Sequence, residues 1–410
     1  MDQSYPSYKT EQRKTDWMNT LQLVFSLCVF VVSILVALAV FFWGVSFSQN
    51  DLARDLGVSA MAMLRVFAWS TVMVAGTALV SVICSARKMS GKAMPAWTQA
   101  KMLWLYGAIA ALPVLFIMGQ NLFRVANLAN TWMPLFSVVS IFIAGIWYMR
   151  IGIGRDWGKT PQRSSGLMTF SFGFTTALIL ISEILVLAVF GLVFFFTTRQ
   201  NPEMQALFQT LPNLLQSFQA DPQAAEQLIA ELILKPGVIS SVIFIIAFLM
   251  PLVEELLKTF GLLLLKGKKL NHREGMQAGI ISGAGFGILE GMLFAIQAGP
   301  GTEPGAWMIF VIGRAAALIL HIFNGALNGF ALVRYWENRK LAHLLGAFLV
   351  TLLIHGVWNL TAVLASANIL DQTLSLSLTI LSFVLVFISY LVFTHKVRNP
   401  TQEIVFSNGL

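Results

Sequence analysis

The sequence predicts an all-α protein, a polytopic transmembrane bundle of about ten helical spans. Three observations lead to this fold class. Hydrophobic residues make up 57% of the chain and charged residues only 11%, whereas a soluble globular chain carries about a quarter charged residues. The apolar residues gather in runs long enough to cross a bilayer, and Lys and Arg recur in the short segments between these runs.

Each span needs about 20 mostly apolar residues. The first apolar run follows a polar stretch and is too long for the apolar region of a cleavable signal peptide, so we expect it to remain as the first span. The expected spans are 21–47, 66–84, 102–119, 132–149, 168–197, 237–265, 276–298, 306–333, 341–367 and 374–394.

The basic residues predict the orientation of these spans. An even number of spans places both termini on one side. With the termini in the cytoplasm, the cytoplasmic segments hold 20 of the 27 Lys and Arg residues, and basic residues favour that side of a membrane. We therefore expect a multi-pass protein of the cell (plasma) membrane with cytoplasmic termini. The net charge of +8 is spread over short loops, so its partner is the lipid bilayer and no nucleic acid is expected.

Charged residues within spans are concentrated after residue 237. We therefore expect an accessory N-terminal region of four spans over 1–165, a membrane core over 166–400 and a tail over 401–410. The polar segment 198–236 contains Asn201-Pro202 and Asp221-Pro222, which look like helix starts. We predict an extracytoplasmic helical hairpin on the membrane surface, with a lid or docking surface for a partner as the alternative.

Ionisable side chains inside spans are costly and mark functional sites by default. Counted from the basic residues at the span ends, Glu255, Glu290, His321 and His355 all lie roughly 16–26 Å from the cytoplasmic edge. Four consecutive spans, the sixth to the ninth, therefore bring acids and imidazoles to one depth, which predicts a single site. The candidate residues are Glu183, Glu254, Glu255, Lys258, Glu290, Arg314, His321 and His355.

The helical spacing groups these residues further. Lys258 follows Glu254 by four positions and Glu255 by three, so it can neutralise one of the two carboxylates. His355 and Asn359 share a face at the same spacing. Pro251 is expected to interrupt the sixth span just before the glutamate pair.

Such a cluster suits peptide-bond hydrolysis by either of two routes. A glutamate can take a proton from water, while a histidine or asparagine donates to the developing oxyanion. Alternatively, two histidines and one glutamate can hold Zn²⁺ with an open position for water, and Glu290, His321 and His355 are the candidate ligands. The residues alone leave both routes open.

The motifs that carry these residues resemble those of the PrsW family of intramembrane proteases. Glu254-Glu255-Leu256-Leu257-Lys258 resembles its EExxK motif, Phe286 to Glu290 its FxxxE motif, the segment from Arg314 to His321 its third motif, and His355 to Asn359 its HxxxN motif. The family is similar to the CAAX-processing and bacteriocin-processing membrane proteases.

The resemblance implies an endopeptidase that cleaves a membrane-anchored substrate within or near the bilayer. An anti-sigma factor or another single-pass protein is the expected substrate. The resemblance implies that the catalytic positions are Glu254, Glu255, Glu290 and His321, with His355 and Asn359 assisting; Lys258 and Arg314 are then supporting residues.

Other interpretations use the same residues. Lys258 with the glutamates, and Arg314 with Glu290, can be ion pairs that fix helix packing. Intramembrane Glu and His also serve proton relays, so a proton-coupled transporter or channel is the first alternative function. A non-enzymatic scaffold or immunity protein on the same fold is the second, since fold alone does not determine function.

Overall fold

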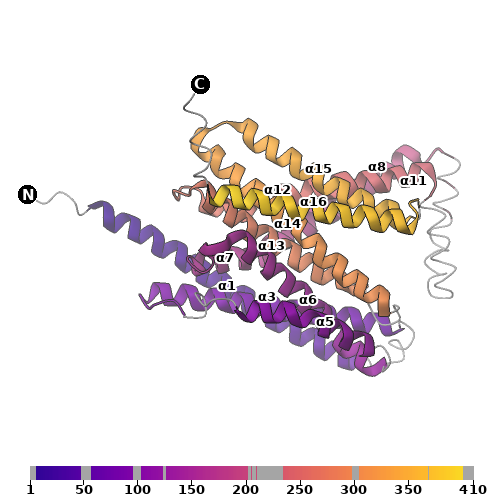
Figure 1. Ribbon diagram of the computed structural model, residues 1–410, viewed down its shortest axis with the longest axis horizontal. Coiled ribbons are helices and arrows are strands. Elements are labelled where there is room, and N and C mark those ends of the chain that lie inside the picture. Colours follow the sequence, from indigo (N-terminus) through magenta and orange to yellow (C-terminus); the bar gives the residue numbers. More distant parts are fainter. Residues whose placement is uncertain are drawn as a thin grey trace, which may run out of the picture. The chain divides into compact units, whose positions relative to one another are not determined.

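The computed structural model describes residues 6–47, 57–95, 103–122, 126–201, 205, 209, 234–297, 304–367 and 369–399. Every regular element in these ranges is a helix, as expected from the sequence (Figure 1). The α-helices are α1 (Pro6–Phe47), α3 (Gly57–Met89), α5 (Leu103–Leu122), α6 (Ala126–Ile153), α7 (Pro161–Phe170), α8 (Thr176–Thr198), α11 (Pro236–Phe244), α12 (Met250–Leu257), α13 (His272–Phe294), α14 (Pro304–Asn338), α15 (Leu341–Ser366) and α16 (Gln372–Arg398).

Short 3₁₀ and π segments connect or interrupt these helices. They are η1 (Gly154–Asp156), η2 (Ser171–Thr175), η3 (Ile245–Leu249), η4 (Phe260–Leu265) and η5 (Ala295–Gln297). Both η2 and η3 are π-helical. Because π segments inside α-helices recur at functional sites, η3 marks the region just before the glutamate pair as a candidate functional site.

Nine helices of the described chain are long and apolar enough to cross a membrane. They correspond to nine of the ten expected spans and confirm a polytopic, multi-pass membrane protein. The remaining expected span, 102–119, coincides with α5, whose section Leu105–Gly119 is apolar but shorter. Most of the expected 198–236 hairpin and the 401–410 tail lie outside the described residues.

The chain forms two compact units. Unit 1 comprises Met1–Thr176, Lys258–Leu344 and Val386–Leu410, and unit 2 comprises Ala177–Leu257 and Leu345–Leu385. One division falls between Leu257 and Lys258, within the expected EExxK motif. The sequence boundary near residue 165 stays a prediction.

In unit 1, helices α13 and α14 pack backbone against backbone. A Cβ on Gly279 would clash with the carbonyl oxygen of Gly325, and a Cβ on Gly283 would clash with the carbonyl oxygen of His321. Small residues allow such close approach between helices in a membrane. The glycines of α13 thereby hold the His321 turn of α14 directly against α13.

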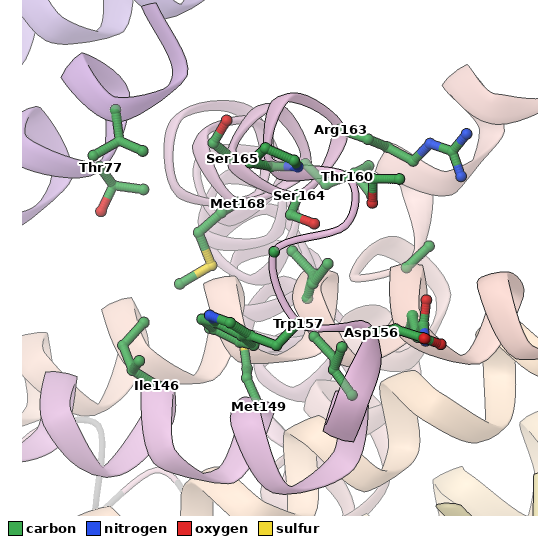
Figure 2. A pocket seen from close by; sticks show the side chains of 18 of the residues that line it. Thr77, Ile146, Met149, Asp156, Trp157, Thr160, Arg163, Ser164, Ser165 and Met168 are labelled. Atoms are coloured by element: carbon green, nitrogen blue, oxygen red, sulfur yellow. The ribbon is translucent and has the colours of Figure 1, made fainter. Parts of the chain in front are cut away.

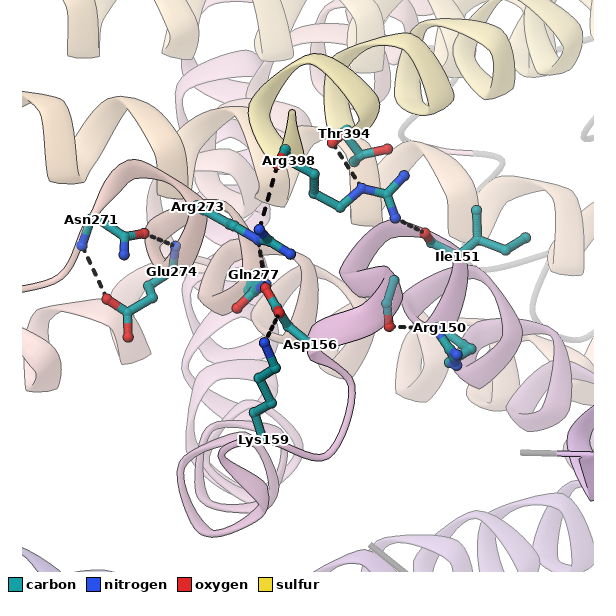
Figure 3. Close-up of polar contacts among 11 residues, drawn as sticks. Arg150, Ile151, Asp156, Lys159, Asn271, Arg273, Glu274, Gln277, Thr394 and Arg398 are labelled. Carbon is teal, nitrogen blue, oxygen red and sulfur yellow. Dashed lines mark hydrogen bonds and ion pairs between the residues drawn. The ribbon is translucent and has the colours of Figure 1, made fainter. Parts of the chain in front are cut away.

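The ends of α6, α13 and α16 are tied together by polar contacts at one end of unit 1 (Figure 3). Arg273 Nε lies 2.5 Å from Asp156 Oδ2, and Lys159 Nζ lies 2.7 Å from the other oxygen of that carboxylate. Gln277 donates a hydrogen bond of 2.7 Å to Asp156. Arg398 donates to the carbonyl oxygen of Ile151 at 2.9 Å. These contacts fix the starting point of α13, which carries Glu290 farther along.

In unit 2, a proline and a π segment determine how α15 packs on the helix before it. The amide of Met250 donates to the carbonyl of Ile245, five residues back. At the same spacing Ile246 would bond to residue 251, but Pro251 has no N–H. Asn359 Nδ2 of α15 donates to this Ile246 oxygen instead, at 2.9 Å. The irregular backbone therefore gives α15 a specific anchoring point one turn beyond His355.

Candidate active site

The glutamate pair of α12 lies against His355 of α15 inside unit 2. His355 Nδ1 is 2.8 Å from Glu255 Oε1, and His355 Nε2 is 3.7 Å from Glu254 Oε2. Glu254, Glu255 and His355 are 6%, 1% and 2% exposed. Burial of two adjacent carboxylates is unfavourable unless hydrogen bonds or cations compensate it, so the imidazole contact is a strong constraint on both helices.

Two local features place His355 at this position. Asn359, one helical turn away, is bonded to the Ile246 carbonyl. Gly356 brings α15 close to η3, since a Cβ there would stand 2.5 Å from the Ala247 carbonyl oxygen. The HxxxN spacing thus has a physical meaning, because the asparagine anchors the helix and the histidine meets the carboxylates.

A second cluster lies inside unit 1. His321 Nε2 is 2.8 Å from Glu290 Oε2, and Arg314 Nη2 is 2.8 Å from Glu290 Oε1. The His321 side chain is 4% exposed and that of Glu290 is 18% exposed. Both oxygens of the Glu290 carboxylate are therefore engaged, one by a guanidinium and one by an imidazole.

Lys258 belongs to this second cluster. Its Nζ lies 3.2 Å from His321 Nδ1 and 5.4 Å from the ring centre of Phe286. The His321 and Phe286 rings also meet edge to face, with centroids 5.2 Å apart. Phe286, the first residue of the FxxxE motif, thus packs against both Lys258 and His321.

The structure interrupts the helical relation that was expected between Lys258 and the glutamates. Helix α12 ends at Leu257, because the chain turns into η4 after Lys258. The Lys258 carbonyl accepts a 2.5 Å hydrogen bond from Ser282 Oγ, and Ser171 Oγ lies 3.1 Å from that hydroxyl. Ser282 was missed at the sequence level, since nothing in its spacing on α13 predicts a partner on another element.

The two histidines share one arrangement. In each, a buried carboxylate contacts one ring nitrogen at 2.8 Å: Glu255 on Nδ1 of His355, and Glu290 on Nε2 of His321. A carboxylate that accepts a hydrogen bond from one ring nitrogen fixes the tautomer of the histidine. The other ring nitrogen then keeps a lone pair that points away from that carboxylate. Histidines held in this way are the usual ligands of catalytic metal ions.

The residues of unit 2 fit a zinc-type ion. The oxygen and nitrogen donors of Glu254 and His355 are of the kinds that zinc prefers. Two ligands at about 2.0–2.1 Å in tetrahedral geometry stand about 3.3 Å apart, and Glu254 Oε2 and His355 Nε2 are separated by 3.7 Å. This gap is too long for a hydrogen bond and close to the separation of two ligands of one ion.

The structure therefore distributes the expected residues over two clusters. Unit 2 brings together the glutamate pair and His355, with Asn359 anchoring the helix. Unit 1 brings together Glu290, Arg314, His321 and Lys258. Glu183 lies half-buried on α8 of unit 2.

The sequence model of one protein family matches the chain. It is described as the PrsW family intramembrane metalloprotease, and it covers residues 167–392, more than half of the chain and all four motif helices. Searches of curated proteins and of solved structures found no match. The chain belongs to the PrsW family of intramembrane metalloproteases and is an intramembrane protease.

Proposed function

We propose that this protease cleaves membrane-anchored protein substrates within or near the bilayer. The observation that carries the proposal is the repeated carboxylate–imidazole pair, Glu255 with His355 and Glu290 with His321, each with 2.8 Å between the atoms. Two pre-oriented imidazoles beside a buried glutamate supply the groups that peptide hydrolysis requires.

The glutamate pair and Lys258 lie close together in the sequence. Glu255 and Lys258 are three residues apart, and three residues span at most about 11 Å between Cα atoms. Lys258 is bonded to His321 in one cluster, and Glu255 is bonded to His355 in the other. Residues 255–258 thus connect the partner of His355 to the partner of His321.

We assign Glu254 and His355 as residues that would hold a zinc ion. When bound, zinc acidifies a coordinated water and polarises the substrate carbonyl. Glu290 and His321 were also expected as ligands. The two Glu290 oxygens already meet Arg314 and His321, and the two His321 ring nitrogens already meet Glu290 and Lys258. That pairing favours a role for Glu290 in orienting the His321 ring.

The remaining roles follow from the contacts. Glu255 accepts the Nδ1 proton of His355 and so directs Nε2 toward Glu254. On the route without a metal, Glu254 is the base that takes a proton from the attacking water. Lys258, held between His321 and Phe286, supplies positive charge for the developing oxyanion.

The position of the site supports a membrane-anchored substrate. Glu290 lies 18 residues after the first residue of α13, and His321 lies 17 residues before the last residue of α14. These separations place both at about 26 Å along helices that are apolar enough to cross a membrane. A single-pass protein such as an anti-sigma factor, in the cell membrane, is the substrate we propose.

The test maps new protein N-termini in membranes from cells that carry the wild type or the Glu254→Gln/Glu255→Gln variant. Glutamine keeps the size of both side chains and removes their charge. New termini near the spans of single-pass proteins, present only with the wild type, are the expected result and identify the substrate. Identical maps from two folded proteins at equal abundance would instead favour a transporter or a scaffold.

A further inference from the structure

A cavity of about 420 Å³ lies within unit 1, at the end where α6 finishes and α13 begins. Figure 2 shows it between α6, which carries Ile146 and Met149, and α7, which carries Ser164 and Met168, with Thr77 of α3 at its side. Its volume falls in the range of small-molecule and cofactor sites. Neither the glutamate pair nor either site histidine lines it.

The interior of the cavity is apolar and the mouth is polar. Phe142, Ile146, Met149 and Met168 line the interior. Asp156, Trp157, Thr160, Arg163 and Glu274 line the mouth. Thr77 lies 12 residues before the end of α3, so the cavity extends about 18 Å inward from the helix end. Its shape and polarity therefore match a ligand with a polar head and a long apolar chain.

Two carboxylates and Arg163 line the mouth, and further cations stand beside it. The carboxylate of Asp156 is neutralised by Arg273 and Lys159, and that of Glu274 by Arg163 at 3.0 Å. Lys88 adds a further cation beside this group, because its Nζ is bonded to Gln162, the neighbour of Arg163, at 3.0 Å.

Lys268 lies four residues before α13, whose first turn lines the mouth through Glu274. Partial desolvation and the like charges of Arg163 and Lys88 lower the pKa of Lys268. Cations held close enough to repel one another are stabilised by an anion. An anionic headgroup at the mouth would relieve this repulsion.

We propose that the cavity binds an anionic phospholipid, with its phosphate at Arg163, Lys88 and Lys268 and one acyl chain among Phe142, Ile146, Met149 and Met168. Basic pockets between membrane helices are suited to anionic headgroups. Trp157 at the mouth is of the residue type that favours the boundary between lipid and water. Because α13 lines the cavity and also carries Glu290, the bound lipid contacts a helix of the protease core.

The test uses the full-length protein in mild detergent, incubated with equal amounts of phosphatidylglycerol and phosphatidylcholine and examined by native mass spectrometry. We expect the wild type to retain one phosphatidylglycerol in preference to phosphatidylcholine. The Lys88→Gln/Lys268→Gln variant should retain it about fivefold more weakly for each cation removed. Met149→Trp, which fills the interior, should also reduce retention.

Arg334→Gln/Lys396→Gln is the matched control, since it removes two exposed cations from α14 and α16, helices that contribute no residue to this cavity. Its retention should equal that of the wild type. Equal losses in both double variants, or equal retention of the two lipids by the wild type, would overturn the proposal. Displacement of the lipid by glycerol phosphate alone at the same concentration would also overturn it, because the site would then recognise a soluble anion. If Met149→Trp fails to fold, the two double variants still decide the question.

Discussion

His355 Nδ1 and Glu255 Oε1 are 2.8 Å apart, and neither residue is more than 2% exposed. This contact joins the last motif of the family to the first, across 100 residues of sequence. It determines which ring nitrogen of His355 is available for chemistry, and it separates the roles of two adjacent glutamates that have identical side chains.

The first prediction concerns Glu255. Glu255→Gln retains an oxygen that can accept the His355 proton but lacks the charge that makes the imidazole a strong ligand. Loss of such an orienting partner costs about 10–100-fold in metal affinity or activity. We expect cleavage of a reporter substrate in proteoliposomes to fall by that factor while the protein stays folded. Glu337→Gln, at an exposed pair with His272, is the control, and equal activity of the two variants would contradict the assignment.

The second prediction concerns metal content. Protein purified without chelators should carry about one zinc ion per chain, measured by elemental mass spectrometry, and dialysis against a chelator should remove the zinc together with the cleavage activity. His355→Ala should lower the zinc content, because it removes a proposed ligand. His343→Ala, at the start of α15, is the matched control. Cleavage that survives complete zinc removal would favour the glutamate route without metal.

The third prediction separates a catalytic from a structural role of Glu290. Arg314→Gln leaves the Glu290 carboxylate, which is 18% exposed, without its guanidinium partner. Removing one partner of a mostly buried hydrogen bond costs about 1–3 kcal/mol of folding free energy. The double variant Glu290→Gln/Arg314→Gln removes both charges and should recover most of the thermal stability lost by the single variant. Cleavage should remain lost in the double variant, because the His321 ring then has no carboxylate. A double variant that is as active as the wild type would reduce Glu290 to a packing residue.

The helices and the identities of the site residues follow from local sequence. Span length, basic loops and ordered motifs predict which helices carry Glu254, Glu290, His321 and His355, because hydrophobic runs and helical rise are local properties. The partners of Lys258 were not predictable in this way. Its contact with His321, and the hydrogen bond from Ser282 to its carbonyl, depend on how α13 and α14 pack around Lys258.

The hydrogen bond at the π segment before the glutamates was likewise not predictable from local sequence. Pro251 indicates an interrupted helix, but the sequence does not reveal that Asn359 satisfies the carbonyl of Ile246. That bond joins residues 113 positions apart, and hydrophobic periodicity contains no information about such pairs. The resemblance to a family supplied the HxxxN spacing, and the structure supplies its physical reason.

The fourth prediction tests whether the bond from Asn359 to the Ile246 carbonyl positions the site. Asn359→Leu removes the donor to the Ile246 carbonyl, and an unsatisfied polar group of this kind costs about 1–3 kcal/mol. Pro251→Ala restores a backbone N–H to the helix, so the pair Pro251→Ala/Asn359→Leu should recover thermal stability. Cleavage should stay low, because a regular helix changes the direction in which Glu254 and Glu255 project from α12. Full activity of the stable pair would show that the irregular backbone does not position the site.

The last prediction concerns the packing of α13 on α14. Gly279→Ala adds a methyl group that would clash with the carbonyl of Gly325, whereas a Cβ on Gly313 of α14 meets nothing within 4 Å. Alanine is the better helix former by about 1 kcal/mol. Gly313→Ala should therefore leave the unfolding temperature unchanged or raise it slightly, while Gly279→Ala should lower it and reduce cleavage, since separation of the helices moves His321 from Glu290. Equal unfolding temperatures for the two variants would mean that close backbone contact does not set the His321–Glu290 distance of 2.8 Å.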